Sequence, residues 1–496
     1  MIGVILAAGI GSRLRPLTSN KPKCLVKTAN KPIIEYQIDA YIKAGIEELI
    51  IVSGYESEAI EKYCKHIKRP RIKIIKNNDY ESTNNMYSLY LAKKHILGKP
   101  FILNNGDLAI DEDIILKLKK SKYKDAIAVD REVYSEESMK ISVDKENHVT
   151  GISKDIARSA AYGVSIDFYK FSAPTGKVLL KEIQHIIEAE DNKKDWTEVA
   201  MQRIFSKKRI KCYPFNIGGS RWVEIDNYED LAVSDRLFSN FDQAINEIDL
   251  ILLDLDGTTY VGSDPVPGAS EVIAQLQSKG KEIYFLSNNS SKTKKDYVDL
   301  LATQGISTSH ERIVLSTDSL INFLKAEESE NLFILGTKKL RENIKDSGFN
   351  VDSDQPEYIV VGYDSELTYE KLKTACYYIN RGADILATHC DKFCPSELGP
   401  IPDAGAILAL LEETTGKRAK FIFGKPDSKI VENFFKNETF TPARTLVIGD
   451  RLHTDIMLAK NISCKSLLVL SGETNREDLE TSEVTPDFIL NSISHI

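Results

Sequence analysis

Two aspartates at the end of one apolar run could carry out phosphoryl chemistry. The run LLDLDG places Asp254 and Asp256 two residues apart, and side chains at this spacing point the same way in a strand. Two carboxylates in one pocket repel each other unless a cation neutralises them, so the pair predicts bound Mg²⁺. In such a site one carboxylate can attack phosphorus, and the other, protonated, can give its proton to the leaving oxygen.

Later stretches in the same half supply matching groups. Ser287 and Asn288 in FLSNNSS are suited to hydrogen-bond a phosphoryl oxygen, and Lys425 in FGKPDS can hold the nucleophile and the phosphoryl group by charge. Asp450 ends the apolar run LVIGD, and Asp455 follows five residues later. Each motif alone could be an ordinary turn, but their order at successive strand ends favours one phosphate site.

Near the start of the chain, a glycine-rich turn precedes two basic residues. In LAAGIGSRLRPLTSNKPKCLV, Gly9 and Gly11 let backbone amides approach phosphate oxygens with no Cβ in the way. Arg13 and Lys23 then supply the positive charge that a triphosphate needs when its α-phosphorus is attacked. A lone turn of this kind more often joins a strand to a helix and carries solvated basic residues. Here the glycines, Arg and Lys occur together and in order, which favours a nucleotide-binding loop.

Strands and helices must position these groups, and both halves of the chain alternate the two. Short β-rich runs and stretches with helical periodicity follow each other, which is typical of sheets covered by helices. Two independent α/β sheets are therefore predicted, the first of them parallel or mixed. The expected strands are residues 3–9, 49–54, 71–77, 101–107, 249–257 and 282–289.

A stretch near residues 236–247 carries no chemical motif and suggests a domain junction. The chain on its N-terminal side is net basic and the remainder is net acidic, within an overall charge of −8. A new strand and helix pattern lies between the phosphate motifs of the second half and predicts an inserted cap. The predicted parts are a first domain (1–240), a linker (241–247), and a second domain (248–496) with its core at 248–330 and 419–496 and its cap at 331–418.

The first half resembles the nucleotidyltransferases that activate sugar phosphates and phospho-alcohols. The resemblance rests on LAAGIGSRLRPLT…KPKCLV, on NNGD at a strand end, and on WVEIDNYEDL. It implies that Asp107 and Asp226 hold Mg²⁺ and that Arg13 and Lys23 bind the phosphates. The residues that it assigns to the nucleotide site are Leu6, Ala7, Ala8, Gly9, Gly11, Ser12, Arg13, Lys23, Asn84 and Asp107.

The chemistry agrees with that assignment. Two carboxylates are about the number that Mg²⁺ takes from protein when phosphates and water fill its other positions. An acceptor phosphate oxygen would attack the α-phosphorus without a general base, because a phosphomonoester dianion is already nucleophilic. Singly, Asp107 could be a turn residue and Asp226 a helix N-cap. A ligand-sensing domain without turnover is a further hypothesis, but such relatives usually lose a phosphate-binding or metal residue that this chain keeps.

Within this family, NNDYESTNNMYSLYLA is similar to the phosphocholine cytidylyltransferase branch, which favours CTP as the donor. Choline recognition requires an aromatic cage, yet the charged stretch 136–149 contains no aromatic residue. We therefore expect a neutral polyol or glycerol phosphate as acceptor, with phosphocholine or a sugar 1-phosphate as alternatives. The CDP-alcohol product would serve cell-surface polysaccharide precursors. Candidate acceptor contacts are Tyr87, Tyr90, Tyr162, Trp196, Trp222 and Glu198.

The second half, about 248–496, resembles the haloacid dehalogenase superfamily, and within it phosphatases related to p-nitrophenylphosphatase that carry a large α/β cap. The resemblance implies a Mg²⁺-dependent phosphatase in which Asp254 is the nucleophile, Asp256 the acid and base, and Asp450 a metal ligand with Asp254 and the Asp256 carbonyl. Further site residues on this reading are Ser287, Asn288, Asn289, Lys425 and Asp455. The predicted fold class is α/β: a Rossmann-like nucleotidyltransferase with a mixed sheet, then a Rossmann-like dehalogenase core with an inserted α/β cap.

The cap stretch ATHCDKFCPSELG offers two interpretations. His389, Cys390, Asp391 and Cys394 could bind zinc, but no second cysteine pair with ligand spacing supports this. We expect instead that the loop reaches over the core site, where His389 and Asp391 contact the organic part of the phosphate ester.

Composition limits the other partners. No secretion signal or apolar run long enough for a membrane span occurs, and the seven cysteines are sparse and read as reduced thiols, so a cytoplasmic location is expected. No basic stripe with interleaved aromatic residues suggests nucleic acid. The expected partners are a nucleotide and small phosphate esters, without a membrane, and a homo-oligomer stays open.

Overall fold

Strand β1 (Ile2–Ala7) is buried along its whole length. Successive side chains in a strand point to opposite faces of the sheet. Val4 and Leu6 accordingly enter one hydrophobic core. Ile5 and Ala7 enter the core on the other face. A strand that is covered on both faces belongs in the middle of a sheet between two helical layers.

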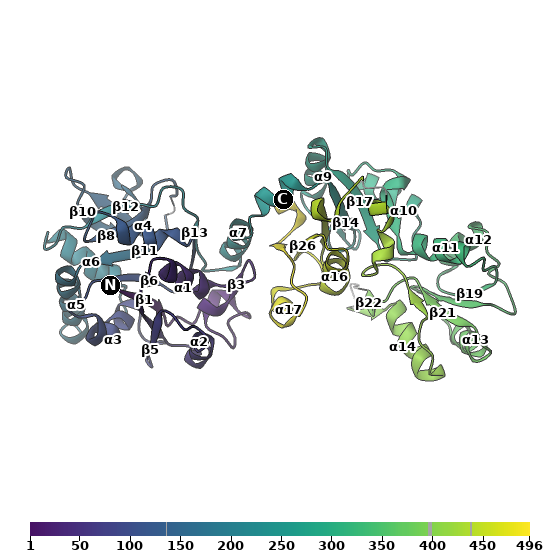
Figure 1. Cartoon of the computed structure of the whole chain (residues 1–496), viewed down its shortest axis with the longest axis horizontal. Helices are drawn as coiled ribbons and strands as arrows, with labels where there is room; N and C mark the ends of the chain where they lie inside the picture. The colour runs from purple at the N-terminus through teal and green to yellow at the C-terminus, as the bar shows by residue number, and fades with distance from the viewer. Residues whose placement is uncertain (135, 395–398, 437–438) are drawn as a thin grey trace. The chain divides into compact units, whose positions relative to one another are not determined.

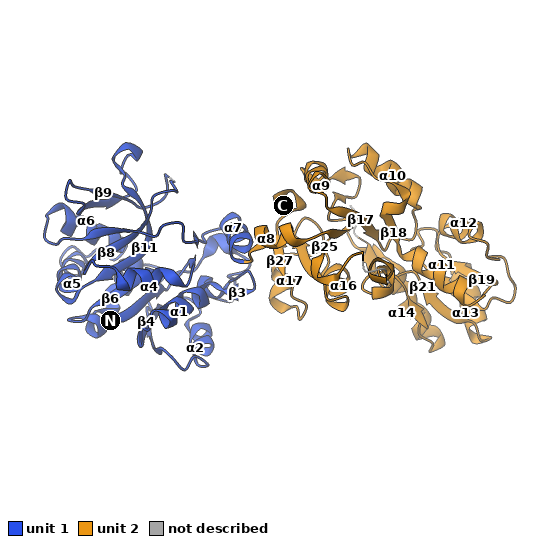
Figure 2. Ribbon diagram, turned by 45° about the horizontal axis from the view of Figure 1, so that its top comes forward, with its two compact units in different colours: residues 1–238 blue, residues 239–496 orange. Residues whose placement is uncertain are grey.

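The computed structural model divides the chain into two compact units, unit 1 (residues 1–238) and unit 2 (residues 239–496), which Figures 1 and 2 show as ribbons. No helix in the described part of the chain combines the length and apolar character that a membrane crossing needs. The structure describes residues 1–134, 136–394, 399–436 and 439–496.

Unit 1 contains a mixed sheet. Its strands, besides β1, are β4 (Glu48–Ser53), β5 (Arg71–Lys76), β6 (Phe101–Asn105), β8 (Ala126–Asp130), β9 (Lys140–Val143), β10 (Val149–Ser153), β11 (Gly163–Phe171) and β12 (Tyr213–Asn216). The order is β10-β9-β11-β6-β1-β4-β5, with β8 beside β11 and β12 beside β8. Strand β1 is parallel to β4 and β6, whereas β11 is antiparallel to β6. Beyond this sheet, β7 (Leu108–Ile110) pairs with β13 (Trp222–Glu224), and β2 (Lys27–Thr28) with β3 (Lys31–Pro32).

Helices cover both faces of this sheet (Figure 2). One core receives side chains from α1 (Ile33–Lys43), α2 (Ser57–Cys64), α4 (Asp113–Lys120) and α7 (Tyr228–Phe238). The other receives side chains from α3 (Asn85–Ile96), α5 (Ala173–Glu188) and α6 (Thr197–Ser206). This arrangement places the C-terminal ends of β1 and β6 side by side, where the predicted nucleotide motifs lie.

The core of unit 2 is a parallel sheet in the order β18-β17-β14-β25-β26-β27. Its strands are β14 (Leu250–Asp254), β17 (Glu282–Ser287), β18 (Ile313–Leu315), β25 (Thr445–Gly449), β26 (Lys465–Val469) and β27 (Phe488–Leu490). The accompanying helices are α8 (Phe241–Ala244), α9 (Ala269–Ser278), α10 (Lys294–Thr303), α15 (Asn433–Lys436), α16 (Met457–Asn461) and α17 (Arg476–Thr481), and a short hairpin joins β15 (Tyr260–Val261) to β16 (Asp264–Pro265). Every strand of the sheet therefore delivers its carboxyl end to the same edge.

The cap is a second, smaller parallel sheet in the order β19-β20-β21-β24. Its elements are β19 (Leu332–Leu335), β20 (Tyr358–Val361), β21 (Asp384–Ala387), β24 (Phe421–Ile422), the hairpin of β22 (Phe393–Cys394) with β23 (Ile401–Pro402), and the helices α11 (Ser316–Ala326), α12 (Lys338–Asp346), α13 (Tyr369–Asn380) and α14 (Ala404–Thr415). Both units thus confirm the predicted α/β class, with a mixed first sheet and a cap inserted into a parallel second one.

Two predicted boundaries need correction. The expected linker 241–247 is folded, because α8 buries Phe241 completely in the core of unit 2. The cap is wider than 331–418, since Leu320 and Leu324 of α11 pack into the cap core and β24 pairs with β21. Short amphipathic stretches next to a junction give no sequence signal that says which core they join.

Candidate active sites

The glycine-rich turn after β1 packs onto the lysine of the predicted nucleotide site. Gly11 has φ +69°, a left-handed conformation that favours glycine, and a Cβ there would lie 2.8 Å from the Cβ of Lys23. The Thr18 hydroxyl donates a hydrogen bond to the Gly11 carbonyl oxygen at 2.8 Å and fixes the turn. The turn therefore needs glycine at position 11 to let the lysine approach.

Lys23 connects the two predicted metal ligands of unit 1. Its Nζ lies 2.8 Å from Asp107 Oδ2 and 2.6 Å from Asp226 Oδ1. Arg13, which is mostly exposed, pairs with the other Asp226 oxygen at 2.8 Å. Burial opposes the charge of Lys23, but the two carboxylates raise its pKa above the ordinary value. The structure thus brings all four predicted residues together.

A third carboxylate, which was not predicted from the sequence, joins this group. Ligand atoms of Asp107, Glu224 and Asp226 all lie within 4.8 Å of one another. Burial and the charges of Asp167 and Asp107 raise the pKa of Glu224. Asp107 Oδ1 is buried without a hydrogen-bond partner among the described residues. An oxygen-only set with an unsatisfied carboxylate oxygen fits Mg²⁺. The alternation in WVEID could have revealed Glu224, because it precedes Asp226 by two residues.

The alternative role of Asp226 as a helix cap is not what the structure shows. The Asn227 side chain accepts the amides of Glu229 and Asp230 at the start of α7, at 2.8 and 3.0 Å. Asp230 in turn accepts the Asp226 amide at 2.8 Å. The Asp226 carboxylate is therefore left to Lys23 and Arg13.

Glu198, a predicted acceptor contact, lies in a buried acidic network. The Tyr169 hydroxyl is 2.8 Å from both Glu198 Oε1 and Asp167 Oδ1, and Asn105 donates to Asp167 Oδ2 at 2.8 Å. Asp167 occupies a left-handed conformation, φ +56°, at an irregularity of β11. A phenol has one proton, so two ionised carboxylates cannot both be satisfied by Tyr169. Burial and the charge of Glu198 raise the pKa of Asp167 to about 7, which favours one shared proton.

The predicted aromatic acceptor contacts do not form a vacant cage. Four of the five rings have a lysine or arginine of this chain over one face at 4.8–5.8 Å, and the fifth, Trp222, donates from Nε1 to Asp130 at 2.8 Å. The four pairs are Tyr87 with Lys193, Tyr90 with Lys93, Tyr162 with Arg131, and Trp196 with Lys154. An additional cation would have to compete with these side chains.

The remaining predicted nucleotide contacts lie around the same strand ends. Leu6 and Ala7 are buried at the end of β1, with Ala8 and Gly9 directly after it. Ser12 begins a short helical turn. Asn84 caps α3, because its side chain accepts the Asn85 amide at 2.8 Å.

In unit 2, the carboxyl ends of β14 and β25 bring their aspartates together. Asp254, Asp450 and Asp455 place ligand atoms within 4.8 Å of one another. Lys425, only 3% exposed, forms ion pairs with Asp254 and, at 2.6 Å, with Asp455. Burial opposes its charge, but these two carboxylates raise the pKa of Lys425. Burial also raises the pKa of Asp254, although Lys425 acts in the opposite direction.

Asp450 occupies a space that two glycines keep open. A Cβ on Gly257 would lie 2.3 Å from Asp450 Oδ2, and one on Gly472 would lie 2.0 Å from it. The same oxygen accepts the Glu473 amide at 2.6 Å. Asp450 Oδ1 is buried and has no hydrogen-bond partner among the described residues. This orphaned oxygen, within a buried carboxylate group, fits Mg²⁺.

The predicted acid, Asp256, follows Asp254 by two residues and is not a member of this carboxylate group. Burial raises its pKa, and the charge of Arg451 lowers it. A carboxyl group whose pKa is raised stays protonated to higher pH, which suits a proton donor.

The side chains of Ser287, Asn288 and Asn289 at the end of β17 form hydrogen bonds with other groups of the protein. The Ser287 hydroxyl lies 2.9 Å from the Tyr297 hydroxyl, and the Asn289 side chain accepts the Ser291 amide at 2.8 Å. Asn288 accepts the Lys425 amide at 2.8 Å and donates to the Lys425 carbonyl at 3.0 Å. Asn288 therefore positions Lys425, and its side chain is not free for a phosphoryl oxygen as predicted.

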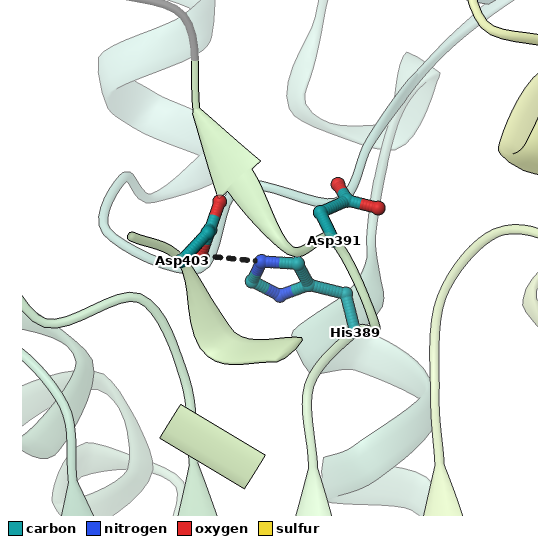
Figure 3. Close-up of side chains that lie close together, drawn as sticks. All are labelled: His389, Asp391 and Asp403. Carbon is teal, nitrogen blue, oxygen red and sulfur yellow. Dashed lines mark hydrogen bonds and ion pairs between the residues drawn. The ribbon is translucent and has the colours of Figure 1, made fainter. Parts of the chain in front are cut away.

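The predicted substrate contact through His389 is also wrong for this structure. His389 is completely buried, and its ring nitrogens lie 2.7 Å from the Thr388 hydroxyl and 2.9 Å from Asp403 (Figure 3). Neither Cys390 nor Cys394 belongs to a potential ligand group among the described residues. Positions 395–398 of this loop lie outside the described residues. The imidazole thus stabilises the cap loop.

Comparison with protein-family models agrees with the division of the chain. A nucleotidyl transferase model matches residues 2–204. A haloacid dehalogenase-like hydrolase model matches residues 251–350, and a related HAD-hydrolase-like model matches residues 422–496. The unmatched stretch between these last two contains most of the cap.

Known relatives match about half of the chain and nearly their own full length. A 5'-nucleotidase, YutF of Bacillus subtilis, is 31% identical over 244 residues, which are 49% of this chain and 95% of that protein. An acid sugar phosphatase of Staphylococcus haemolyticus is 31% identical over 239 residues, 48% of this chain and 90% of the relative. The crystal structure of a 4-nitrophenylphosphatase from Thermotoga maritima is 38% identical, covers 51% of this chain and 97% of its own, and has a TM-score of 0.49. The family models and the two curated relatives show that the chain belongs to the haloacid dehalogenase-like hydrolases through unit 2 and carries a nucleotidyl transferase domain in unit 1.

Proposed function

We propose that the chain is a bifunctional enzyme that transfers CMP from CTP to a small phospho-alcohol and hydrolyses a small phosphomonoester. One observation carries the proposal: each unit gathers three carboxylates at or after the carboxyl ends of its strands, with a lysine of little solvent exposure between two of them. Such a group suits phosphate chemistry, because it combines sites for Mg²⁺ with fixed positive charge.

In unit 1 the acceptor phosphate oxygen would bond to the α-phosphorus of CTP, and the bond from that phosphorus to pyrophosphate would break. Lys23 and Arg13 would exchange carboxylates for phosphates and neutralise the departing charge. Asp107 and Asp226, with Glu224 beside them, would hold Mg²⁺, which supplies further charge neutralisation when bound. Unit 1 needs no general base for this reaction, because the acceptor is already ionised.

The acceptor that we propose is a glycerol or other polyol phosphate. The support is the set of cationic side chains over Tyr87, Tyr90, Tyr162 and Trp196, which oppose a quaternary ammonium at those rings. Phosphocholine and sugar 1-phosphates are the alternatives. A panel of these acceptors with CTP, UTP, dTTP and GTP, scored by mass detection of the product, decides among them and also excludes a ligand-sensing domain without turnover.

In unit 2 an Asp254 oxygen would bond to the phosphorus of the ester, and the ester oxygen would leave with the proton of Asp256. Water would then release phosphate from Asp254, with Asp256 taking up a proton. Lys425 would hold the nucleophile, and Asp254 and Asp450 would provide sites for Mg²⁺. The named activities of the relatives, nucleotide and sugar phosphate hydrolysis, make a small phosphomonoester the substrate class that we propose.

Two substitutions separate the activities. Asp107→Ala should abolish CTP-dependent pyrophosphate release and leave phosphate release from an added ester unchanged. Asp254→Asn should lower phosphate release by about 100-fold or more and leave the CDP product unchanged. Retention of both activities in both variants would refute the assignment.

A further inference from the structure

The cap residue Asp391 is held by the core of unit 2. Both of its carboxylate oxygens lie 3.4 Å from Asn288 Nδ2, and one lies 3.2 Å from Arg451 Nη1. The Asp391 side chain is only 8% exposed. In Figure 3 it points away from the imidazole of His389, which contacts Asp403 instead. Asp391 therefore joins the cap loop after β21 to two core residues.

The contact of Asp391 with Asn288 connects the cap loop to Lys425, which pairs with the predicted nucleophile Asp254. Asn288 binds both backbone groups of Lys425, at 2.8 and 3.0 Å, and the Lys425 ammonium pairs with Asp254. A side-chain amide that holds a backbone segment at both its donor and its acceptor fixes that segment in orientation. A displacement of Asp391 would therefore reach Lys425 through Asn288.

The contact of Asp391 with Arg451 connects the cap loop, through Glu473, to the predicted metal ligand Asp450. Arg451 Nε lies 2.8 Å from Glu473, and the Glu473 amide donates to Asp450 Oδ2 at 2.6 Å. The Arg451 side chain is 18% exposed, so its charge requires nearby acids. If Asp391 is neutralised, Arg451 keeps only Glu473 as an ion-pair partner among the described residues. Arg451 and Glu473 can then move together.

We propose that Asp391 is a positioning residue, and that its contacts with Asn288 and Arg451 couple the seating of the cap loop to the placement of Lys425 and Asp450. The inference rests on the phosphatase function proposed above and adds a role for the cap in it. Asp391 would act through the core residues and would not select the organic part of the ester.

The group His389, Asp391 and Asp403 could also be considered as a metal site. It does not support one, because both ring nitrogens of His389 are already paired and Asp391 is bound by Arg451. These contacts favour positioning over metal binding.

The kinetic test compares Asp391→Asn with the wild-type full chain on p-nitrophenyl phosphate and glycerol 3-phosphate. We expect kcat to fall about 10- to 100-fold on both esters by the same factor, with KM unchanged. A loss on one ester alone, or a loss in KM, would show that Asp391 reads the substrate and would overturn the proposal. The matched control is Asp384→Asn, a cap aspartate whose ion pair with Lys420 is exposed, and it should behave as wild type.

A thermodynamic cycle tests the coupling. The double variant Asp391→Asn/Arg451→Met should lose less activity than the product of the two single losses, because Asp391 and Arg451 share a contact. Losses that multiply would contradict the coupling. Arg451→Lys keeps the charge and should restore part of the activity lost in Arg451→Met, which separates positioning from a general folding defect.

Hydrogen exchange gives a readout that does not depend on turnover. In Asp391→Asn the amides of Lys425 and Glu473 should exchange faster than in wild type, whereas β14 should keep its protection. Unchanged exchange at both amides would overturn the inference. If wild-type protein hydrolyses neither ester, the proposed function fails, while the exchange result still decides the role of Asp391.

Discussion

At the scale of single residues, both units place a lysine of little solvent exposure between two carboxylates that come from distant parts of the chain. Lys23 joins Asp107 to Asp226, and Lys425 joins Asp254 to Asp455. Carboxylates so close together would repel each other in a site of low polarity, and the lysine offsets this repulsion. The lysines therefore have a structural role in the free protein in addition to any role with phosphate.

This structural role predicts the effect of Lys425→Met on stability. Asp254 and Asp455 would be left buried without their cation, so the free energy of unfolding of unit 2 should fall by about 3 kcal/mol or more at neutral pH in the absence of divalent ions. Denaturant unfolding with EDTA measures this change. The control Lys420→Met removes an exposed partner of Asp384 and should not change stability measurably. An equal loss in both variants would show that burial of the pair is not the cause.

Asp167 predicts a pH dependence of stability in unit 1. Its folded pKa, about 7, lies above the value for an unfolded chain because of burial and the nearby Glu198. The folded state therefore binds more protons, and this contribution to stability is present at low pH and is lost as the pH rises from about 4 to 7. Asp167→Asn, which tolerates the left-handed backbone, should gain stability relative to wild type over this range. Thermal unfolding at several pH values measures the difference, and a difference that does not vary with pH would contradict the assignment.

For residues that directly follow strands, the sequence predicts which of them come together in the site. Asp107, Asp254 and Asp450 come at or just after the ends of buried parallel strands, and the topology of such a sheet gathers those ends at one edge. The contacts of Glu198 and His389 could not be predicted in this way. Their hydrogen bonds to Tyr169 and Asp403 depend on side-chain packing between elements, which has no periodic signal in the sequence.

At the scale of elements, the hydrophobic pattern of the sequence predicted the strands better than it predicted the boundaries between domains. Strands β1 and β14 alternate their side chains between two cores, so an uninterrupted apolar run indicates a central strand. Helices α8 and α11 have only one buried face each, and that face could pack on either neighbouring core. Their membership follows from tertiary contacts, which explains the errors at the linker and the cap.

Gly472 packs closely against Asp450 and Gly257, and this packing predicts that Gly472→Ala impairs the phosphatase. The new Cβ would lie 2.0 Å from Asp450 Oδ2 and 2.7 Å from the Gly257 Cα, so Asp450 must move. Phosphate release should fall by about 100-fold, whereas formation of the CDP product by unit 1 in the same chain should not change. That internal activity and the unfolding temperature of unit 2 serve as controls. Full phosphatase activity in a folded variant would show that Asp450 does not need its observed position.

At the scale of the whole molecule, the two units have separate hydrophobic cores. The clusters of unit 1 contain residues before 239 and those of unit 2 begin with Phe241, and no described buried apolar residue is shared between them. A domain with its own core can in principle fold alone. The function proposed for each unit also uses only residues of that unit.

Separation of the chain between Phe238 and Ser239 should therefore yield two folded proteins. Residues 1–238 should keep the CTP-dependent activity, and residues 239–496, which retain Phe241 in their core, should keep the phosphatase. CTP with Mg²⁺ should raise the unfolding temperature of the first fragment alone, because a ligand stabilises only the fold that binds it. Calorimetry of the intact chain should accordingly resolve a transition that responds to CTP and another that does not. A single cooperative transition, or loss of either activity on separation, would mean that the units depend on each other for stability.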